Sequence, residues 1–202
     1  MNAVALLKQQ HRDVKKLFKE ALNASSPEKC QRAAEQVCDQ LAVHATIEEK
    51  IFYPEAMSDK TEDMLREAVE EHLGVKRIIA DLMESEPSDP QYISKVTVLK
   101  EMIEHHVEEE ESDLFPRVEK RLGQSALKEM GARMEAMASE LMENKEPRQA
   151  VPGETSMAAP LPTPEEAEAA AMSSEEDDEE KPPAKPRKRA PLRAKSARRE
   201  AR

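Results

Sequence analysis

Apolar residues in the first part of the chain recur every three or four positions, which is the spacing of one face of an α-helix. The pattern covers residues 3–23, 27–53, 61–84 and 91–115 and predicts a helix in each of these segments. Ser26-Pro27 and Asp89-Pro90 stand where a helix would begin, because Ser and Asp cap helix starts and proline suits the first turn. Short connections favour antiparallel neighbours. The expected fold is therefore all-α, an up-down antiparallel four-helix bundle.

The second pair of helices repeats the first. His44-x3-Glu48 returns as His106-x3-Glu110, and each motif is followed by a further Glu, an aromatic residue and a proline. On a helix, residues four apart lie on one face, so each His and its Glu can point at the same spot. The prolines are expected to close the two helices or to begin their exit. The chain is thus predicted to be a duplicated helical hairpin.

One further histidine precedes each motif, on the other helix of the same hairpin. His72 stands 61 residues after His11, and each is followed three positions later by a valine. At about 1.5 Å per residue, all four histidines would lie roughly 20–26 Å from the hairpin turns. Four antiparallel helices would then bring four His and two Glu to one level of the core. Metal sites in helix bundles are built in this way.

Imidazoles and carboxylates together form a ligand set for a transition metal, and iron fits this set well. Six ligands are too many for one tetrahedral zinc ion, but they suit two metals, each with two histidines and with both carboxylates bridging. Each metal would then keep an open position for O2, peroxide or nitric oxide. The expected metal ligands are His11, His44, Glu48, His72, His106 and Glu110.

Several neighbours of these residues have two interpretations each. Glu49 and Glu111 either accept hydrogen bonds from the metal-binding histidines or belong to a solvated acidic face. His105 either packs against the bundle or adds a ligand. A seventh ligand would be His105, Tyr53, Tyr92 or water, and the sequence does not decide among them.

The ordered set of His, His-x3-Glu, His and His-x3-Glu resembles the hemerythrin-like (HHE cation-binding) domain family over about residues 1–118. The resemblance implies a four-helix bundle with a non-haem di-iron centre, in which two iron ions share an oxo or hydroxo bridge at the six positions given above. Oxygen-carrying members have a fifth histidine one turn after the third, where this chain has Lys76. Because a lysine would have to lose its proton to bind a metal, the resemblance favours peroxide or nitric oxide chemistry over simple oxygen carriage.

Composition separates the rest of the chain from the bundle. All five aromatic residues lie before residue 117, so the last part of the chain cannot build much of a core. We expect an additional helix at 119–146, in which methionines recur at helical spacing and pack against the bundle or a partner. Residues 147–202 are expected to be a disordered, low-complexity tail with an acidic run and then a basic end.

The tail ends in a basic segment that could bind a partner. Residues 181–202 hold ten Lys/Arg and one Glu, whereas the whole chain has a net charge of −11. This segment could bind the phosphates of a nucleic acid, engage a protein partner, or only keep the chain soluble. The sequence slightly favours the last of these, because the acidic run lies beside the basic end.

The cysteines and the lack of long apolar runs bear on the cellular compartment of the protein. Cys30 and Cys38 are eight residues apart on one expected helix, too far for a disulfide, and free thiols suggest a reducing compartment. No segment approaches the run of about 20 apolar residues that a membrane-spanning helix needs. We therefore expect a cytoplasmic protein without a membrane partner.

Three functional hypotheses follow. The first is a non-haem di-iron protein that binds or reacts with a small oxidant, namely O2, peroxide or nitric oxide. The second is an enzyme that disproportionates peroxide at the same centre, as a catalase does. The third is a regulatory module that senses iron or oxygen and acts through its charged tail. No general acid or nucleophile stands out beyond the metal ligands, so whether the protein is an enzyme stays open.

Overall fold

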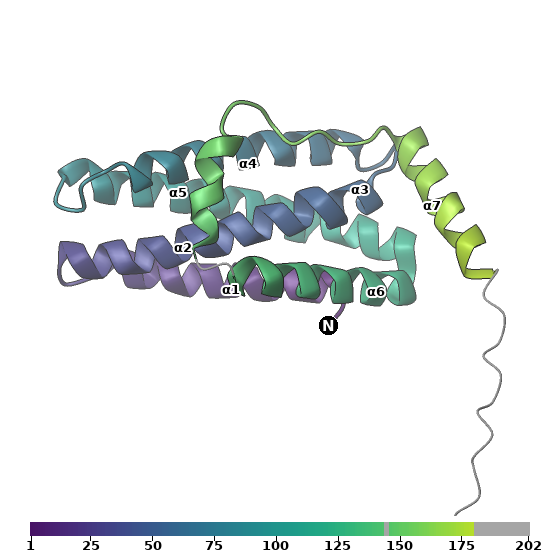
Figure 1. Cartoon of the computed structure of the whole chain (residues 1–202), viewed down its shortest axis with the longest axis horizontal. Helices are drawn as coiled ribbons and strands as arrows, with labels where there is room; N and C mark the ends of the chain where they lie inside the picture. The colour runs from purple at the N-terminus through teal and green to yellow at the C-terminus, as the bar shows by residue number, and fades with distance from the viewer. Residues whose placement is uncertain (144–145, 180–202) are drawn as a thin grey trace, which may run out of the picture.

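The computed structural model describes residues 1–143 and 146–179. Four long helices form two antiparallel hairpins, α1 (Ala3–Leu22) with α2 (Pro27–Ile47) and α4 (Glu62–Met83) with α5 (Pro90–Glu109) (Figure 1). Among the described residues every regular element is helical, which confirms the predicted all-α bundle. None of the helices in those ranges is long and apolar enough to span a lipid bilayer.

The helices begin where the sequence predicts. The side chain of Ser26 accepts a hydrogen bond from the Lys29 N–H, and that of Asp89 accepts one from the Gln91 N–H. Pro27 and Pro90 occupy the first turn of α2 and α5, where a missing N–H costs nothing. These caps fix where each hairpin turns and therefore how far along each helix the histidines lie.

Two π-helical turns stand at the same place in the two hairpins. Glu48–Phe52 (η1) follows α2 and leads into the short helix α3 (Tyr53–Ala56), and Glu110–Leu114 (η2) follows α5 and leads into α6 (Phe115–Glu143). Neither Pro54 nor Pro116 therefore closes its helix: α3 ends two residues after Pro54, and α6 continues far beyond Pro116. Each proline is the second residue of the next helix, and proline is tolerated in the first turn of a helix.

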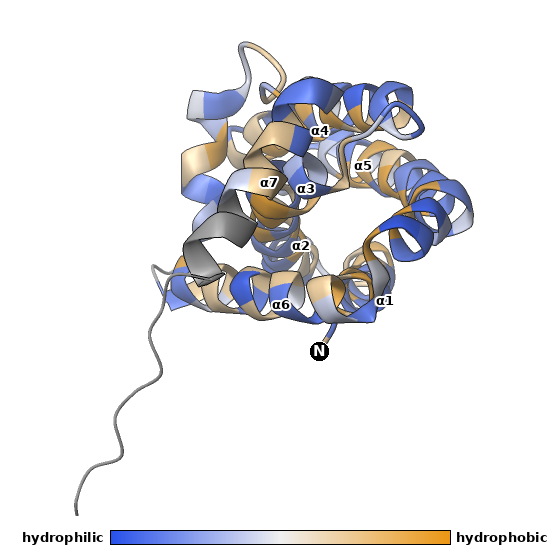
Figure 2. Ribbon diagram, turned by 90° about the vertical axis from the view of Figure 1, so that its right-hand side faces the viewer, coloured by the Kyte–Doolittle hydropathy of each residue, from blue (hydrophilic) through white to orange (hydrophobic). Residues whose placement is uncertain are grey.

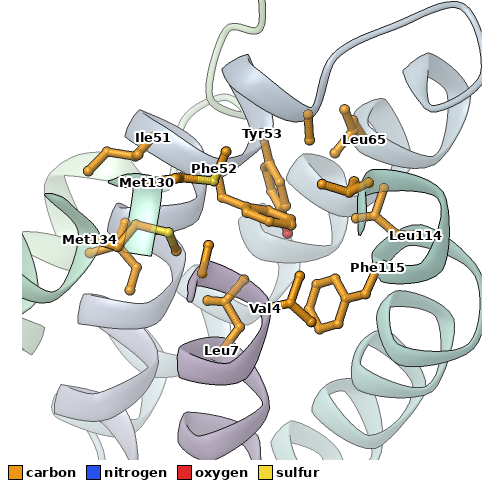
Figure 3. Close-up of a cluster of buried hydrophobic side chains, with 14 of the residues drawn as sticks. Val4, Leu7, Ile51, Phe52, Tyr53, Leu65, Leu114, Phe115, Met130 and Met134 are labelled. Carbon is orange, nitrogen blue, oxygen red and sulfur yellow. The ribbon is translucent and has the colours of Figure 1, made fainter. Parts of the chain in front are cut away.

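The core consists of two apolar clusters with the level of the four histidines between them. One cluster surrounds Phe52, Tyr53 and Phe115 (Figure 3), and the other surrounds Phe18 and Leu99 near the hairpin turns. An end-on view shows apolar residues on the inner faces of the helices and polar residues outside (Figure 2). A polar layer of side chains is thus enclosed by apolar packing on both sides.

The helix expected at 119–146 is the second part of α6, which folds back onto α1 and α2 after a kink. Gly123 makes this kink with a φ of 74°. Met130 and Met134 are fully buried against the bundle (Figure 3), and Met137 packs beside them. These methionines therefore pack against the bundle, which is the first of the two interpretations that the sequence allowed.

Replacing Gly123 by alanine is expected to lower the free energy of unfolding by about 1 kcal/mol or more, because a β-carbon disfavours positive φ. A β-carbon added at Gly123 would meet no atom within 4 Å, so the cost is backbone strain rather than a clash. Gly153→Ala is the matched control, since that glycine also has free space and no positive φ. Equal urea midpoints for the two variants would contradict this account of the kink.

The structure differs from the expectation of a disordered tail over residues 147–179. A 3-10 helix, η3 (Pro147–Glu154), crosses from α2 to α4, and α7 (Pro164–Glu179) follows it (Figure 1). We call η3 the strap. Arg148 binds Asp39 at 2.6 Å between Nη1 and Oδ2, and Val151 is buried among core residues. These contacts hold a short segment whose composition predicts none of this. The basic end, 181–202, lies outside the described residues.

Candidate metal centre

All six residues predicted as metal ligands meet at one level of the bundle. Each is buried, with at most 6 % of its surface exposed. One histidine comes from each long helix, and one glutamate begins each π-helical turn. The residues that the structure brings together are His11, His44, Glu48, His72, His106 and Glu110.

The four imidazoles form two pairs that face the centre through Nε2. The Nε2 atoms of His11 and His44 are 3.2 Å apart, and those of His72 and His106 are also 3.2 Å apart. Each pair comes from the two helices of one hairpin. The duplicated sequence therefore produces two half-sites with two histidines each.

The two carboxylates span these half-sites. Glu48 Oε2 lies 3.2 Å from His44 Nε2 and 3.4 Å from His72 Nε2. Glu110 Oε2 lies 3.4 Å from His11 Nε2 and 3.6 Å from His106 Nε2. Each glutamate therefore touches one histidine of each pair, which is the arrangement expected of carboxylates that bridge two cations.

The outer nitrogen of every ring is held by a neighbouring residue. Glu111 and Glu49 lie 2.8 and 3.1 Å from Nδ1 of His11 and His72, so the interpretation as hydrogen-bond acceptors is confirmed for both. Gln10 and Glu71 lie 2.8 Å from Nδ1 of His44 and His106. A ring that donates through Nδ1 turns its Nε2 lone pair inward, as in metal sites where a carboxylate orients the ligand histidine.

Gln10 and Glu71 were missed by the sequence reasoning, although the repeat contains the signal for them. Each stands one position before the first histidine of its hairpin and contacts the second histidine of that hairpin. Glu49 and Glu111 instead cross to the other hairpin. Aligning the two hairpins and asking which polar positions recur beside the ligands would have found all four residues.

The donor set fits a pair of cations. Glu48 Oε1 and Glu110 Oε2 are buried, and neither accepts a hydrogen bond from any residue that the structure describes. The donor atoms fall into two groups, and within each group all atoms lie within 4.8 Å of one another. One group consists of His11, His44, Glu48 and Glu110, and the other of Glu48, His72 and His106. Glu48 belongs to both groups. Buried oxygen atoms without hydrogen bonds are stabilised by a nearby positive charge, so these residues could hold two metal ions.

Electrostatics lead to the same conclusion. Burial and the nearby Glu110 carboxylate raise the pKa of Glu48 well above its usual range, whereas burial and the neighbouring His11 lower the pKa of His44 well below its usual range. Burial disfavours either charge in isolation. A bound cation would reverse the penalty on Glu48 and would match the neutral form of His44 that binds metals.

Of the three side chains that the sequence left open as a seventh ligand, Tyr53 lies in the centre. Its hydroxyl donates to Glu110 Oε1 at 3.0 Å and lies 3.3 Å from His72 Nε2, and its ring stacks on His72. Phe115, its counterpart in the repeat, stacks on His11 in the same way. Tyr92 is buried in the apolar cluster near the hairpin turns, and His105 is exposed on α5.

Lys76 lies beside the centre but faces away from the Nε2 atoms. Its Nζ lies 2.8 Å from Glu49 Oε2 and 2.8 Å from Glu154 Oε2 of the strap. Burial acts to lower the pKa of Lys76, but hydrogen bonds to Glu154 and Glu49 outweigh it and raise the pKa above its usual value. A protonated lysine cannot bind a metal, which agrees with the interpretation of this position from the sequence.

Two cavities adjoin the centre. The α4–α5 cavity has a volume of about 240 Å³ and is lined by His106, Glu110, Glu71 and Glu109, among others. The α1–α5 cavity has a volume of about 670 Å³ and includes His11 and Glu111 in its wall. Small molecules and ions can therefore approach both half-sites from solvent.

Comparisons with known proteins agree with this geometry. The family model for the hemerythrin HHE cation binding domain matches residues 2–118. The crystal structure of a hemerythrin HHE cation binding domain-containing protein from Mycobacterium kansasii is similar, with a TM-score of 0.62 and 26 % identity; the match covers 75 % of this chain and 97 % of that one. A Nostoc sp. protein named DNA nickase is 27 % identical over 143 residues, which are 71 % of this chain and 41 % of the relative. The chain thus spans less than half the length of that relative.

Proposed function

Because the chain belongs to the hemerythrin HHE cation-binding domain family, we propose that it holds two iron ions and binds or reacts with a small oxidant, namely O2, peroxide or nitric oxide. The observation that carries this proposal is the pairing of four imidazole Nε2 atoms under two carboxylates that each touch both pairs. Such a set has the number and type of donors for two ions of borderline hardness.

Each of the six central residues has a definite part in the proposed site. His11 and His44 would hold one ion, His72 and His106 the other, and Glu48 and Glu110 would bridge them. Iron bound there would supply exchange between its ferrous and ferric states. The outer partners of the rings would keep each Nε2 deprotonated and correctly aimed through changes of charge at the centre.

Tyr53 is the described residue best placed to assist a bound oxidant. Its hydroxyl is buried beside both carboxylates, at 3.0 Å from Glu110 Oε1 and 3.4 Å from Glu48 Oε2. Burial and the adjacent Glu110 raise the pKa of this hydroxyl well above its usual value, so it stays a hydrogen-bond donor. A polar oxidant that reached the centre would find this donor beside the two carboxylates.

The choice among oxidants rests on Lys76. Lys76 stands where a fifth histidine would complete one half-site, and its ammonium group is fixed by Glu49 and Glu154. Two half-sites with the same number of histidines would leave both ions open to a ligand. This supports peroxide or nitric oxide over reversible carriage of O2.

The test is the metal content and absorption spectrum of freshly purified protein, followed by titration with nitric oxide and with peroxide. About two irons per chain and near-ultraviolet bands that shift with each titrant are expected of this donor set. Fewer than one iron per chain after loading with ferrous iron under anaerobic conditions would refute the di-iron proposal. Steady release of O2 from excess peroxide would favour the catalase-like alternative, and its absence would favour binding or a single reaction.

A second candidate function is regulation through the tail. The observations that favour it are the ten basic residues at 181–202 and the similarity to a relative named DNA nickase. The strap packs on the bundle, so a clean deletion begins after residue 179 rather than at residue 147. Salt-dependent binding to a DNA duplex that disappears with this deletion would support the hypothesis, whereas equal binding by both chains would reject it.

A further inference from the structure

We propose that Glu71, His105 and Glu109 form a third divalent-cation site, on the surface, which captures ferrous iron and passes it through the α4–α5 cavity to the buried centre. His105 Nε2 lies 3.6 Å from Glu71 Oε1 and 3.4 Å from Glu109 Oε1. The three ligand atoms lie within 4.8 Å of one another. One imidazole and two carboxylates are a suitable set for a ferrous ion that keeps several waters.

The three residues are fixed by two neighbouring helices. His105 and Glu109 are four apart on α5 and therefore share a face, and Glu71 of α4 approaches that face from the other side. Side-chain exposure is 61 % for His105, 42 % for Glu109 and 21 % for Glu71. A hydrated cation can therefore reach the three residues directly from solvent.

Glu71 joins this outer site to the buried centre. Its Oε1 faces His105, and its Oε2 lies 2.8 Å from Nδ1 of His106. The α4–α5 cavity contains Glu71 and Glu109 together with His106 and Glu110 in one wall. Glu110 Oε2 is buried and without a hydrogen bond from the described residues, so an ion that left the outer site would find an unsatisfied carboxylate at the next step.

Charge distinguishes this cavity from the other one. Five carboxylates and one arginine line the α4–α5 cavity: Glu67, Glu71, Glu109, Glu110 and Asp113 with Arg117. The α1–α5 cavity is nearer to balance, because Lys15 and Lys100 stand beside its three glutamates. A cleft lined by one sign of charge concentrates the opposite ion and can raise association rates roughly 10- to 1000-fold. The α4–α5 cavity is therefore the route that a cation would take.

The outer residues also have a simpler interpretation as a surface ion pair, and kinetics of iron uptake can separate the two. Metal-free full-length protein is mixed with ferrous iron, and the growth of near-ultraviolet absorption in air reports arrival at the centre. In Glu109→Gln and in His105→Ala we expect uptake to slow about tenfold, with the final iron content equal to that of the parent. Glu108→Gln is the control, because Glu108 has the same charge but lines the α1–α5 cavity.

Unchanged uptake in both outer variants, or an equal slowing in Glu108→Gln, would overturn the proposed route. A titration with Co²⁺ tests the outer site itself: the parent should bind one more equivalent than His105→Ala, and equal stoichiometry would overturn the site. The route rests on the proposed di-iron function, but the two fail differently. A parent that holds no iron would end the proposed function and the route together, whereas the Co²⁺ comparison would still decide whether the outer site exists.

Discussion

Replacing Glu48 by glutamine is expected to remove most of the iron from the purified protein, with affinity lowered by more than about 100-fold, the upper end of the loss seen for outer partners of metal ligands. Glu48 is fully buried and contacts one histidine of each half-site. It belongs to both groups of donor atoms, so its loss removes charge from both ion positions at once. Iron per chain after anaerobic loading is the measurement.

The same substitution should leave the metal-free protein folded. The pKa of Glu48 is raised well above the usual range, chiefly by burial, so the folded chain binds this proton more tightly than the unfolded chain does. Between the ordinary glutamate pKa and the higher pKa of the folded state, the free energy of unfolding of the metal-free chain therefore falls as pH rises, because folding then requires Glu48 to take up a proton. Glutamine resembles the protonated form, and that part of the pH dependence should be missing from urea unfolding of the variant.

Glu101→Gln is the matched control for Glu48→Gln, because Glu101 is exposed on α5 and away from the centre. It should keep the iron and the pH dependence of the parent. If Glu48→Gln retained two irons per chain, the assignment of Glu48 as a shared ligand would be wrong. A variant that lost its helical circular dichroism when metal-free would instead show that Glu48 is needed for folding.

Replacing Lys76 by methionine is expected to lower the free energy of unfolding of the metal-free protein by about 3 kcal/mol, the cost of leaving a buried charge without its partner. The Lys76 side chain is 7 % exposed and that of Glu49 is 9 % exposed. Without the ammonium group, the Glu49 carboxylate keeps only its contact with His72 in this region. The contact between α4 and the strap through Glu154 is lost as well.

Glu154→Gln separates the two contributions to that loss. Its side chain is 47 % exposed, and an ion pair open to solvent contributes about 1 kcal/mol or less. We therefore expect a small change in the urea midpoint for Glu154→Gln and a large one for Lys76→Met. Similar midpoints for the two variants would show that the buried pair of Lys76 and Glu49 adds little to stability.

The main features of the fold and site were accessible from the sequence because they depend on periodicity. The helical spacing of apolar residues gives four helices, and the position of each histidine relative to its turn gives one common level. The side chains of His11, His44, His72 and His106 all point there because each occupies an inward position of its helix. The meeting of the four histidines therefore follows from local geometry that single helices dictate.

Other features depend on contacts that no local pattern encodes. The π-helical turns at Glu48 and Glu110 add a residue to a turn, and the prolines that follow suggest a helix end instead. The strap was missed because residues 147–159 are rich in Pro, Ala and polar residues, which is typical of disorder. Its attachment includes the ion pair of Arg148 with Asp39, a pairing over 109 residues that sequence alone cannot specify.

The stacking of Tyr53 on His72 and of Phe115 on His11 has a consequence for the two halves of the centre. The contacts of Glu48 mirror those of Glu110, since each glutamate touches the second histidine of its own hairpin and the first histidine of the other. A perfect repeat would make the two ion positions identical. The hydroxyl of Tyr53 breaks this symmetry, because Phe115 has nothing to donate at the matching place. Gln10 beside His44, where the other hairpin has Glu71 beside His106, breaks it again. Two ions at these positions would then differ in affinity and in reduction potential, so a repeated ligand set with unlike neighbours gives a centre with a preferred end.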